Sequence, residues 1–385
     1  MKKVIGIDIG NAKTELFFET KDGEKSVRQP SVISYLLRSP DAPDLTEEQV
    51  MSSLMDNLLV TISSKAIKKN GLYYVGNRAL LHHGMKSNMN LDLGGKTNHD
   101  VPLITSLSMV AASAIKEHYD QHKELPENMN IEIKMATAIP SSEYSQANAK
   151  RLEERFKERH TVVVHVGEEE ILTSIKVSEC KVTEEGKTAM LAFYESDPSI
   201  LSHYNELYNE NKVPSDFDEA ISLHTDIGDG TTELTVINGL SPVQGLSSGS
   251  RLGVGHASMD AISLLRDTTM NIGNDFTRQQ LQEWLKQDSE RGQIVRGFME
   301  EAIYNQSVAI LETIKAAYQK LASSNVDYLF VHGGGSITFE DHLKNEVVDF
   351  ARDNHTKVVW IPKEYASQMN SRGTYSLAKM LYEKK

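Results

Sequence analysis

The sequence predicts an α/β protein with two domains, and three observations lead to that prediction. The chain has 385 residues, more than one hydrophobic core usually supports, and 39% of them are hydrophobic, as in globular proteins. Short apolar runs typical of strands alternate with segments of helical periodicity. One motif, an apolar run that enters a turn containing Asp and Gly, occurs twice, at Asp8 and at Asp226. The chain is therefore expected to have two related halves.

The first half opens with a predicted β-hairpin. Residues 4–9 form an apolar run, a small-residue turn follows, and residues 14–18 again have strand character. A helical pattern through Val50, Leu54, Leu58 and Ile62 predicts a helix within a small insertion. The remaining elements expected in this half are a helix from about 103 to 115 and strands at 131–139, 161–166 and 171–182.

The second half repeats this opening. Residues 220–225 predict a strand, residues 233–237 its hairpin partner, and a charged helical segment follows. Further strands are expected at 328–331 and 357–361, each followed by a helix. The stretch 195–218 is polar and contains two prolines, which predicts a linker or surface segment.

These elements give the expected domain organisation. Domain I spans 1–218, with a small insertion subdomain at about 27–100, and the C-terminal helix at 364–385 returns to it. Domain II spans 219–363 and contains a helical insert at about 261–321.

The composition argues against several classes of protein. The formal net charge of -13 argues against direct binding to nucleic acid or to an anionic membrane. Cys180 is the single cysteine, which excludes an intrachain disulfide, and we expect it to be a packing residue. The apolar stretch at 4–7 is too short for a signal peptide, so we expect a cytoplasmic protein.

The two hairpin turns are the strongest chemical signal. In each, an aspartate ends the first strand and small residues let backbone amides approach a phosphate, while the carboxylate faces the water shell of a metal ion. Asp8 and Asp226 are the candidate Mg²⁺ residues, acting through water. The candidate phosphate-binding residues are Gly10, Asn11, Ala12 and Lys13 in the first turn, and Gly228, Asp229, Gly230, Thr231 and Thr232 in the second. A tight glycine turn with no ligand is the alternative for each loop, and a solvated surface lysine is the alternative for Lys13.

A third glycine-rich turn follows the strand at 328–331. Gly333, Gly334, Gly335 and Ser336 leave backbone without bulky side chains, against which a purine or ribose could pack. A flexible turn between strand and helix is the alternative.

Together these motifs resemble a known family. Gly6-Ile7-Asp8-Ile9-Gly10-Asn11, Asp226-Ile227-Gly228-Asp229-Gly230-Thr231-Thr232 and Val331-His332-Gly333-Gly334-Gly335 are similar in order and spacing to the nucleotide-binding motifs of the actin, sugar-kinase and heat-shock-chaperone superfamily. Within it, the chain resembles the plasmid-segregation actins of the ParM or StbA type. The additional matching segments are Thr137 to Tyr144, Lys181 to Glu185 and Ser247 to Gly255.

The resemblance implies an actin-like ATPase fold. Each of its two domains has a mixed β-sheet flanked by helices, and the nucleotide, ATP or GTP with Mg²⁺, lies in the interdomain cleft. Asp8 and Asp226 would hold the water shell of Mg²⁺ and help to place the attacking water, and Lys13 would neutralise phosphate charge. Glu185 would polarise that water, with Glu184 as the neighbouring candidate. Asp229 stands where these loops commonly have glycine, and a carboxylate there repels phosphate unless it turns away or meets the metal shell.

The resemblance also implies partners. The ATP-bound form would assemble with copies of itself into dynamic filaments, and an adaptor of the ParR type, bound to a centromere-like plasmid site, would couple the filament to DNA. No direct contact with nucleic acid or membrane is expected. The alternatives are a shape-determining bacterial actin, a metabolic kinase of the same superfamily, and a nucleotide switch that does not polymerise.

Overall fold

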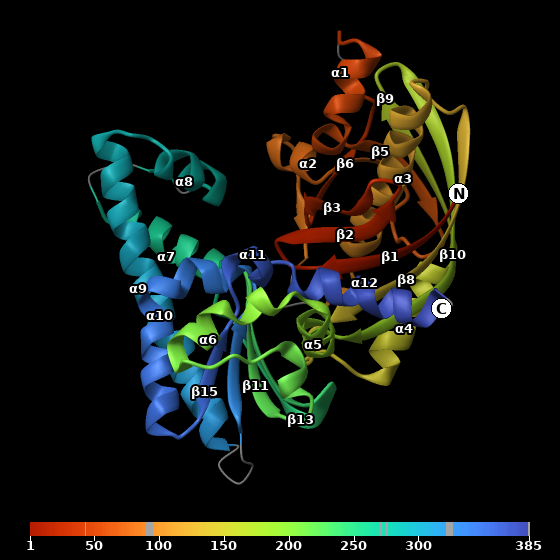
Figure 1. The fold of residues 1–385 in the computed structure, drawn as a ribbon. Helices are drawn as coiled ribbons and strands as arrows, with labels where there is room; N and C mark the ends of the chain where they lie inside the picture. The colour runs from red at the N-terminus through yellow and green to blue at the C-terminus, as the bar shows by residue number, and fades with distance from the viewer. Residues whose placement is uncertain (43, 90–94, 269–271, 274–275, 321–325, 384–385) are drawn as a thin grey trace. The chain divides into compact units, whose positions relative to one another are not determined.

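The chain divides into two compact units. The computed structural model describes residues 1–42, 44–89, 95–268, 272–273, 276–320 and 326–383. The first unit is Met1–Leu191 together with Asn370–Lys385, and the second is Ala192–Met369 (Figure 1). Each unit is built on its own β-sheet, with helices packed against it.

The sheet of the first unit has the strand order β3-β2-β1-β8-β10-β9-β5-β6-β4-β7. Its strands are β1 (Lys2–Ile9), β2 (Lys13–Thr20), β3 (Gly23–Pro30), β4 (Val32–Leu36), β5 (Leu59–Ser64), β6 (Gly71–Val75), β7 (Ser87–Asn88), β8 (Asn128–Ile139), β9 (Arg159–Val166) and β10 (Glu169–Glu184). β1 and β2 form the predicted antiparallel hairpin, and β1 runs parallel to β8. β10 is parallel to β8 and antiparallel to β9.

Helices cover both faces of this sheet at β1. The helical elements are α1 (Glu47–Ser52), the 3₁₀ turns η1 (Leu54–Asn57) and η3 (Lys96–Asn98), α2 (Asn77–Leu81), α3 (Val101–His122), α4 (Gln146–Lys157), α5 (Glu185–Glu195) and α12 (Met369–Tyr382). Ile5 and Val110 of α3 line the same small cavity, while a Cβ on the next residue, Gly6, would overlap the backbone of Tyr375 in α12. Only glycine allows α12 to pack this closely, and residues 370–385 accordingly group with the first unit.

The helix predicted through Val50, Leu54, Leu58 and Ile62 is wrong in its second half. α1 and η1 account for the first two positions, but Leu58 immediately precedes the strand β5 and Ile62 lies within it. Leu58, Val60 and Ile62 are all fully buried, which is the alternation of a strand. A spacing of four residues fits one face of a helix and one face of a strand equally, and pairing with β9 decides for the strand.

The sheet of the second unit repeats the opening of the first. Its order is β13-β12-β11-β14-β15, and its strands are β11 (Ile221–Ile227), β12 (Thr232–Asn238), β13 (Ser241–Ser250), β14 (Tyr328–His332) and β15 (Lys357–Trp360). β11 and β12 form an antiparallel hairpin, and β11 runs parallel to β14. A hairpin whose first strand has a parallel neighbour is the same arrangement as β1, β2 and β8.

The helical elements of the second unit include the predicted insert. They are η4 (Pro198–Leu201), α6 (Ser202–Tyr208), η5 (Pro214–Phe217), α7 (Val254–Arg266), α8 (Arg278–Leu285), α9 (Glu290–Lys320), α10 (Gly334–Asp353) and α11 (Lys363–Ala366). α7, α8 and α9 pack on one another, and the range expected for the insert, about 261–321, begins within α7.

The segment 195–218 is a surface segment of the second unit rather than a linker, which are the two alternatives that its polar composition predicts. Tyr204 and Phe217 are buried, and their rings contact Tyr328 and Phe330 of β14. Ile200 and Leu201 are also fully buried, so apolar side chains fix this polar segment to the second unit, and the two aromatic residues each bury a large apolar area. The boundary between the compact units therefore falls at Leu191, before this segment rather than after it.

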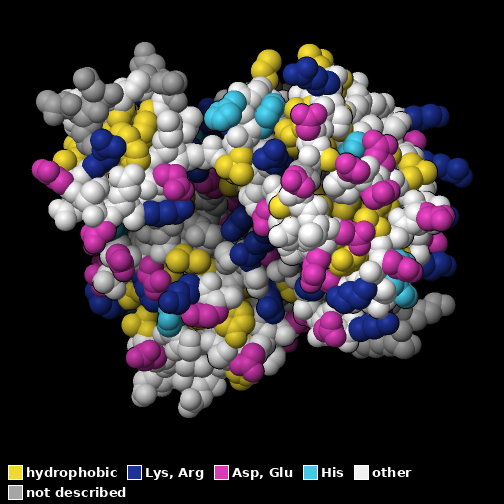
Figure 2. Space-filling model, turned by 90° about the horizontal axis from the view of Figure 1, so that it is seen from above, with side chains coloured by type: hydrophobic (Ala, Val, Ile, Leu, Met, Phe, Trp, Pro, Cys, Tyr) yellow, Lys and Arg dark blue, Asp and Glu magenta, His cyan; other side chains and the backbone are white. Residues whose placement is uncertain are grey.

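The surface carries charges of both signs. Acidic, basic and hydrophobic side chains are interspersed on the face drawn in Figure 2. Within the described residues, no helix has the length and apolarity needed to cross a membrane.

Candidate functional site

The turn of the first hairpin is fixed from behind by Ser31. The Ser31 hydroxyl donates to the carbonyl of Gly10 at 2.6 Å, and its backbone N–H donates to the carbonyl of Ala12 at 2.9 Å. A Cβ on Gly10 would lie 2.6 Å from the carbonyl oxygen of Lys13, so the turn requires glycine there. The side-chain oxygen of Asn11 is buried and has no hydrogen-bond partner among the described residues. A tight turn with an unpartnered polar atom fits a loop that accepts a polar ligand.

Asp8 lies at the end of β1, one residue before that turn. It is partly exposed and pairs in register with Glu15 of β2. Glu15 is buried and accepts hydrogen bonds from Arg28 at 2.6 Å and from Ser371 at 2.9 Å. Glu15 thus has a structural role in the core. Asp8 is the partly exposed carboxylate beside the turn of this hairpin.

The second hairpin presents Asp226 in the same way. Asp226 is the second-last residue of β11, and the Gly228 N–H donates to the Thr231 carbonyl at 2.8 Å to close the turn. The beginning of α7 packs against this turn, since the Gly255 N–H donates to the carbonyl of Asp229 at 2.8 Å. The turn is therefore held in one conformation by a neighbouring helix, as a preformed phosphate loop would be.

The carboxylate of Asp229 forms an ion pair within the second unit. Arg278, the first residue of α8, donates to both carboxylate oxygens of Asp229, at 3.0 and 2.5 Å. This two-pronged contact is the arrangement in which guanidinium binds carboxylate best. The sequence left open whether Asp229 turns outward or meets a metal shell, and the structure pairs it with Arg278.

The third glycine-rich turn lies directly against the end of β11. Gly333 caps the N-terminus of α10 with φ 90°, in the left-handed region that favours glycine. A Cβ there would overlap Asp226 Oδ1, and one on Gly335 would lie 2.7 Å from the side chain of Ile227. Gly333 and Gly335 are thus required for α10 to begin beside Asp226. The first N–H groups of a helix lack intrahelical partners and attract anions.

Two buried histidines lie beneath this turn. Burial lowers the pKa of His332, although the carboxylate of Asp226, 3.8 Å away, acts in the opposite direction. Burial and the neighbouring His332 hold the pKa of His224 well below its usual range. His224 stacks on Phe330 with ring centroids 4.6 Å apart. Both imidazoles are therefore neutral at pH 7 and form part of the core behind Asp226.

The two candidate glutamates differ in their surroundings. Glu184, the last residue of β10, is partly exposed, and its pKa is raised by burial against the opposing effects of Ser141 and Lys187. Glu185, the first residue of α5, is buried and forms an ion pair with Lys96. The structure thus gives one of them a fixed cationic partner.

Lys96 is the functional candidate that the motifs missed. It lies in η3, and its ammonium contacts Glu185 while Asp8 and Glu143 act on it electrostatically. Burial alone would lower the pKa of Lys96, but the carboxylates, Glu185 first, outweigh it and raise that pKa. The run Gly95-Lys96-Thr97 was the available signal, since glycine followed by lysine and threonine is typical of phosphate loops.

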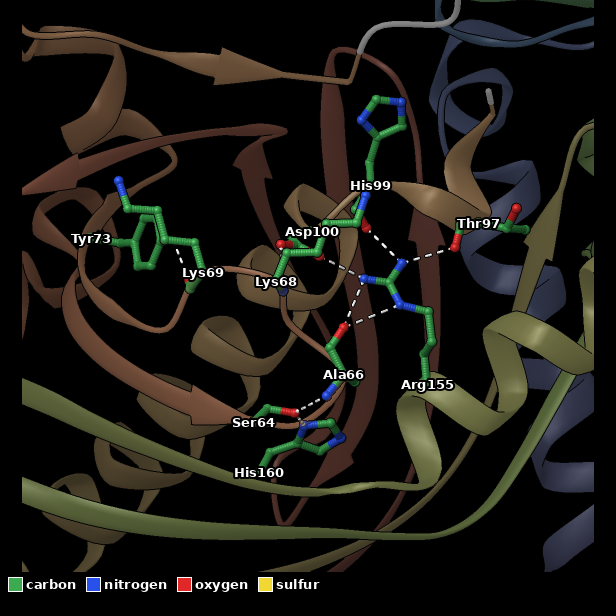
Figure 3. Close-up of polar contacts among 10 residues, drawn as sticks. All are labelled: Ser64, Ala66, Lys68, Lys69, Tyr73, Thr97, His99, Asp100, Arg155 and His160. Carbon is green, nitrogen blue, oxygen red and sulfur yellow. Dashed lines mark hydrogen bonds and ion pairs between the residues drawn. The ribbon is translucent and has the colours of Figure 1, made fainter. Parts of the chain in front are cut away.

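A buried guanidinium anchors the segment that carries Lys96. Figure 3 shows Arg155, from α4, surrounded by backbone carbonyls of the turn at Ala66 and of the segment 97–99. Its nitrogens donate to the carbonyls of Thr97 at 2.8 Å, His99 at 2.7 Å and Ala66 at 3.0 Å. The same guanidinium pairs with the Asp100 carboxylate at 2.8 Å. The segment is therefore tied to α4 at several points.

Comparison with known proteins agrees with this arrangement. Residues 6–187 match the sequence family described as the N-terminal domain of actin-like proteins. No curated protein matches the chain. Among solved structures, Alp7A, an actin-like protein, is similar with a TM-score of 0.71 and 17% identity, covering 99% of this chain and 97% of that one.

ParM proteins are similar over the same length. Bacillus thuringiensis ParM with ATP gives a TM-score of 0.63 and 17% identity, covering 99% of this chain and 98% of that chain. A quadruple mutant of pCBH ParM gives a TM-score of 0.64 and 19% identity, covering 99% and 100%. The chain has an actin-like fold. The α/β prediction and the predicted likeness to ParM-type proteins are confirmed at this level.

Within this actin-like fold, the structure groups the predicted residues into local sets. In the second unit, Asp226, the turn at 228–232 and the turn at 333–336 lie together. In the first unit, Asp8 and Glu185 lie near one ammonium, that of Lys96. Lys13 is exposed at the start of β2.

Proposed function

We propose that the protein is a nucleotide-dependent polymerising ATPase that forms dynamic filaments for plasmid DNA segregation. The observation that carries the proposal is the repeated hairpin: each unit presents an aspartate beside a glycine turn, on a strand with a parallel neighbour. The fold is that of proteins solved with ATP, ADP and AMPPNP, in the case of Bacillus thuringiensis ParM.

The chain's own groups suit the handling of phosphates. Backbone amides of the turns at 10–13 and 228–232 would bind phosphate oxygens, and the exposed ammonium of Lys13 would add a point charge. The start of α10 at Gly334 would add the positive end of a helix. At Gly10, Gly333 and Gly335 a Cβ would clash with neighbouring atoms, so the backbone there must lack a side chain.

Glu185 would orient the attacking water. Transfer of a phosphoryl group to water needs in-line placement and charge neutralisation more than covalent chemistry. A buried carboxylate held by a fixed partner is suited to accept a hydrogen bond from that water. Glu184 is the alternative, and substitution of each distinguishes them.

Asp8 and Asp226 would hold Mg²⁺ through its water shell. When bound, Mg²⁺ neutralises charge on the phosphate oxygens. In the described residues, no three His, Cys, Asp or Glu side chains cluster as direct ligands would. Each aspartate stands beside its own glycine turn, which fits contact through water and phosphate rather than a cage of side chains.

Assembly and partners complete the proposal. Self-association into filaments is supported by the likeness to ParM proteins, one of which was solved as a non-polymerisable quadruple mutant. The net charge of -13 favours contact with DNA through a ParR-type adaptor rather than directly. The proposed location is the cytoplasm.

Light scattering at 90° recorded together with phosphate release tests this proposal. Purified protein is given Mg²⁺-ATP, Mg²⁺-GTP or no nucleotide, beside an Asp226→Asn variant that keeps the side-chain shape but removes its charge. A rise in scattering that needs nucleotide, followed by phosphate release, with both lost in the variant, supports the proposal. Turnover without scattering would instead favour a metabolic kinase or a switch that does not polymerise.

A further inference from the structure

An ammonium buried beside the candidate catalytic glutamate needs an explanation. The Lys96 side chain is 3% exposed and that of Glu185 11% exposed. Removing a lysine from water is costly, and a buried ion pair often contributes less to stability than apolar residues of the same size would. A role in stability alone is therefore a weak reason for placing this pair here.

Several contacts on both sides of Lys96 position it in the fold. Its backbone N–H donates to the Glu143 carboxylate at 3.0 Å, and Gly95 before it has φ 70° and no room for a Cβ against the same carboxylate. On its other side, the guanidinium of Arg155 holds the carbonyls of Thr97 and His99 (Figure 3). Both ends of the short turn η3 are thus fixed, which leaves the ammonium little freedom.

Three carboxylates act on the one ammonium of Lys96. The carboxylates of Glu185, Asp8 and Glu143 all act on the ammonium. The guanidinium of Arg155 forms its ion pair with another carboxylate, that of Asp100. The buried ammonium of Lys96 is therefore influenced both by the carboxylate proposed to orient water and by the carboxylate proposed to face the metal.

We propose that Lys96 is a positioning residue for hydrolysis, whose ammonium holds the Glu185 carboxylate by a direct ion pair in the orientation that faces the attacking water. This inference rests on the proposed ATPase function. No proton leaves Lys96 in the reaction; its ammonium fixes the orientation of the group that accepts the hydrogen bond from water. The turn at 95–100 thereby becomes part of the catalytic apparatus, although it lies outside the three glycine turns at 10–13, 228–232 and 333–336.

Steady-state kinetics of phosphate release test this role. The variants are Lys96→Met, Lys96→Arg, Glu185→Gln and the double Lys96→Met/Glu185→Gln, with Lys65→Met as the control because Lys65 is an exposed lysine of the same unit. Nucleotide affinity and melting temperature are measured for each variant. The double variant carries no buried charge from this pair, so it remains interpretable even if Lys96→Met alone folds poorly.

A positioning role predicts a specific pattern. Lys96→Met lowers kcat by about 10- to 100-fold with KM nearly unchanged, since orientation of the water-polarising group is part of what such catalysis supplies. Lys96→Arg recovers part of the loss, and Lys65→Met behaves as wild type. The double variant is no slower than Glu185→Gln alone, because Lys96 acts through Glu185.

Two results would overturn the inference. One is a Lys96→Met variant with wild-type kcat. The other is a double variant whose loss is the product of the two single losses, which would mean that Lys96 acts independently of Glu185. If the wild type itself releases no phosphate, the proposed function fails instead, so the two failures are distinguishable.

Discussion

Replacing Arg155 by alanine should loosen the segment that carries Lys96. The guanidinium donates to three backbone carbonyls, those of Ala66, Thr97 and His99, and pairs with Asp100. Alanine leaves these acceptors without their shared donor. The Asp100 carboxylate keeps the hydrogen bond that it accepts from the Lys68 N–H at 2.8 Å, but it loses its ion pair.

The magnitude follows from the burial of this pair. The side chains of Arg155 and Asp100 are 15% and 16% exposed, so water replaces the lost donors only in part. Breaking a buried pair costs about 3–5 kcal/mol, and the remaining exposure places the Arg155→Ala loss near the lower limit, at about 3 kcal/mol. Arg155→Lys should lose somewhat less than Arg155→Ala, because its ammonium can still pair with Asp100. It should not match wild type, because one ammonium cannot reach all of these acceptors.

The matched control is Arg151→Ala. Arg151 lies one turn earlier on α4, is exposed, and makes one hydrogen bond, to Asn98 at 3.1 Å. Its loss should cost less than about 0.5 kcal/mol, as for an ordinary surface substitution. Urea unfolding gives the stabilities, and hydrogen exchange at residues 95–100 reports local opening. Equal stability and equal exchange in the two variants would refute this account of the segment.

Three further predictions concern the second unit. Arg278→Gln should weaken binding of a fluorescent nucleotide about 5- to 10-fold by exposing the charge of Asp229 to the phosphates, and adding Asp229→Gly should restore it; an unchanged affinity in the single variant would count against this. Gly333→Ala should destabilise the protein by ~1–3 kcal/mol, because the φ of 90° and the close packing at Gly333 exclude a Cβ. Gly297→Ala should instead stabilise the protein by up to ~1 kcal/mol, because α9 has open space at this position. Melting curves of the two variants measure both effects. The depressed pKa of His224 means that the unfolded chain binds more protons, so stability is lost as pH falls below about 6.5, and His224→Phe should flatten that pH dependence in urea titrations; an unaltered slope would contradict this.

The hairpins were predictable because their signals are local. Each strand pair lies within about twenty residues, and Asp and Gly at fixed offsets both describe the turn and indicate its chemistry. The structure adds what surrounds the turns: Ser31 behind the first, and Arg278 beside the second. Arg278 is 49 residues from Asp229 in the chain, so no local pattern could have paired them.

The missed features depend on distant contacts. Lys96 and Glu185 are 89 residues apart, and a lone lysine in a polar segment most often belongs to the surface. β5 looks helical by spacing and becomes a strand because β9 offers an edge. The segment 195–218 looks like a linker until Tyr204 and Phe217 meet the aromatic residues of β14. In each case tertiary packing overrode local composition.

Electron microscopy of negatively stained protein tests the central claim, nucleotide-dependent assembly, most directly. The samples are wild type with Mg²⁺-ATP, with Mg²⁺-GTP and without nucleotide, and the Asp226→Asn variant with each nucleotide. The account predicts filaments for wild type with a hydrolysable nucleotide, and none for the nucleotide-free protein or the variant. Absence of wild-type filaments with both nucleotides, or equal filaments in all samples, would contradict it.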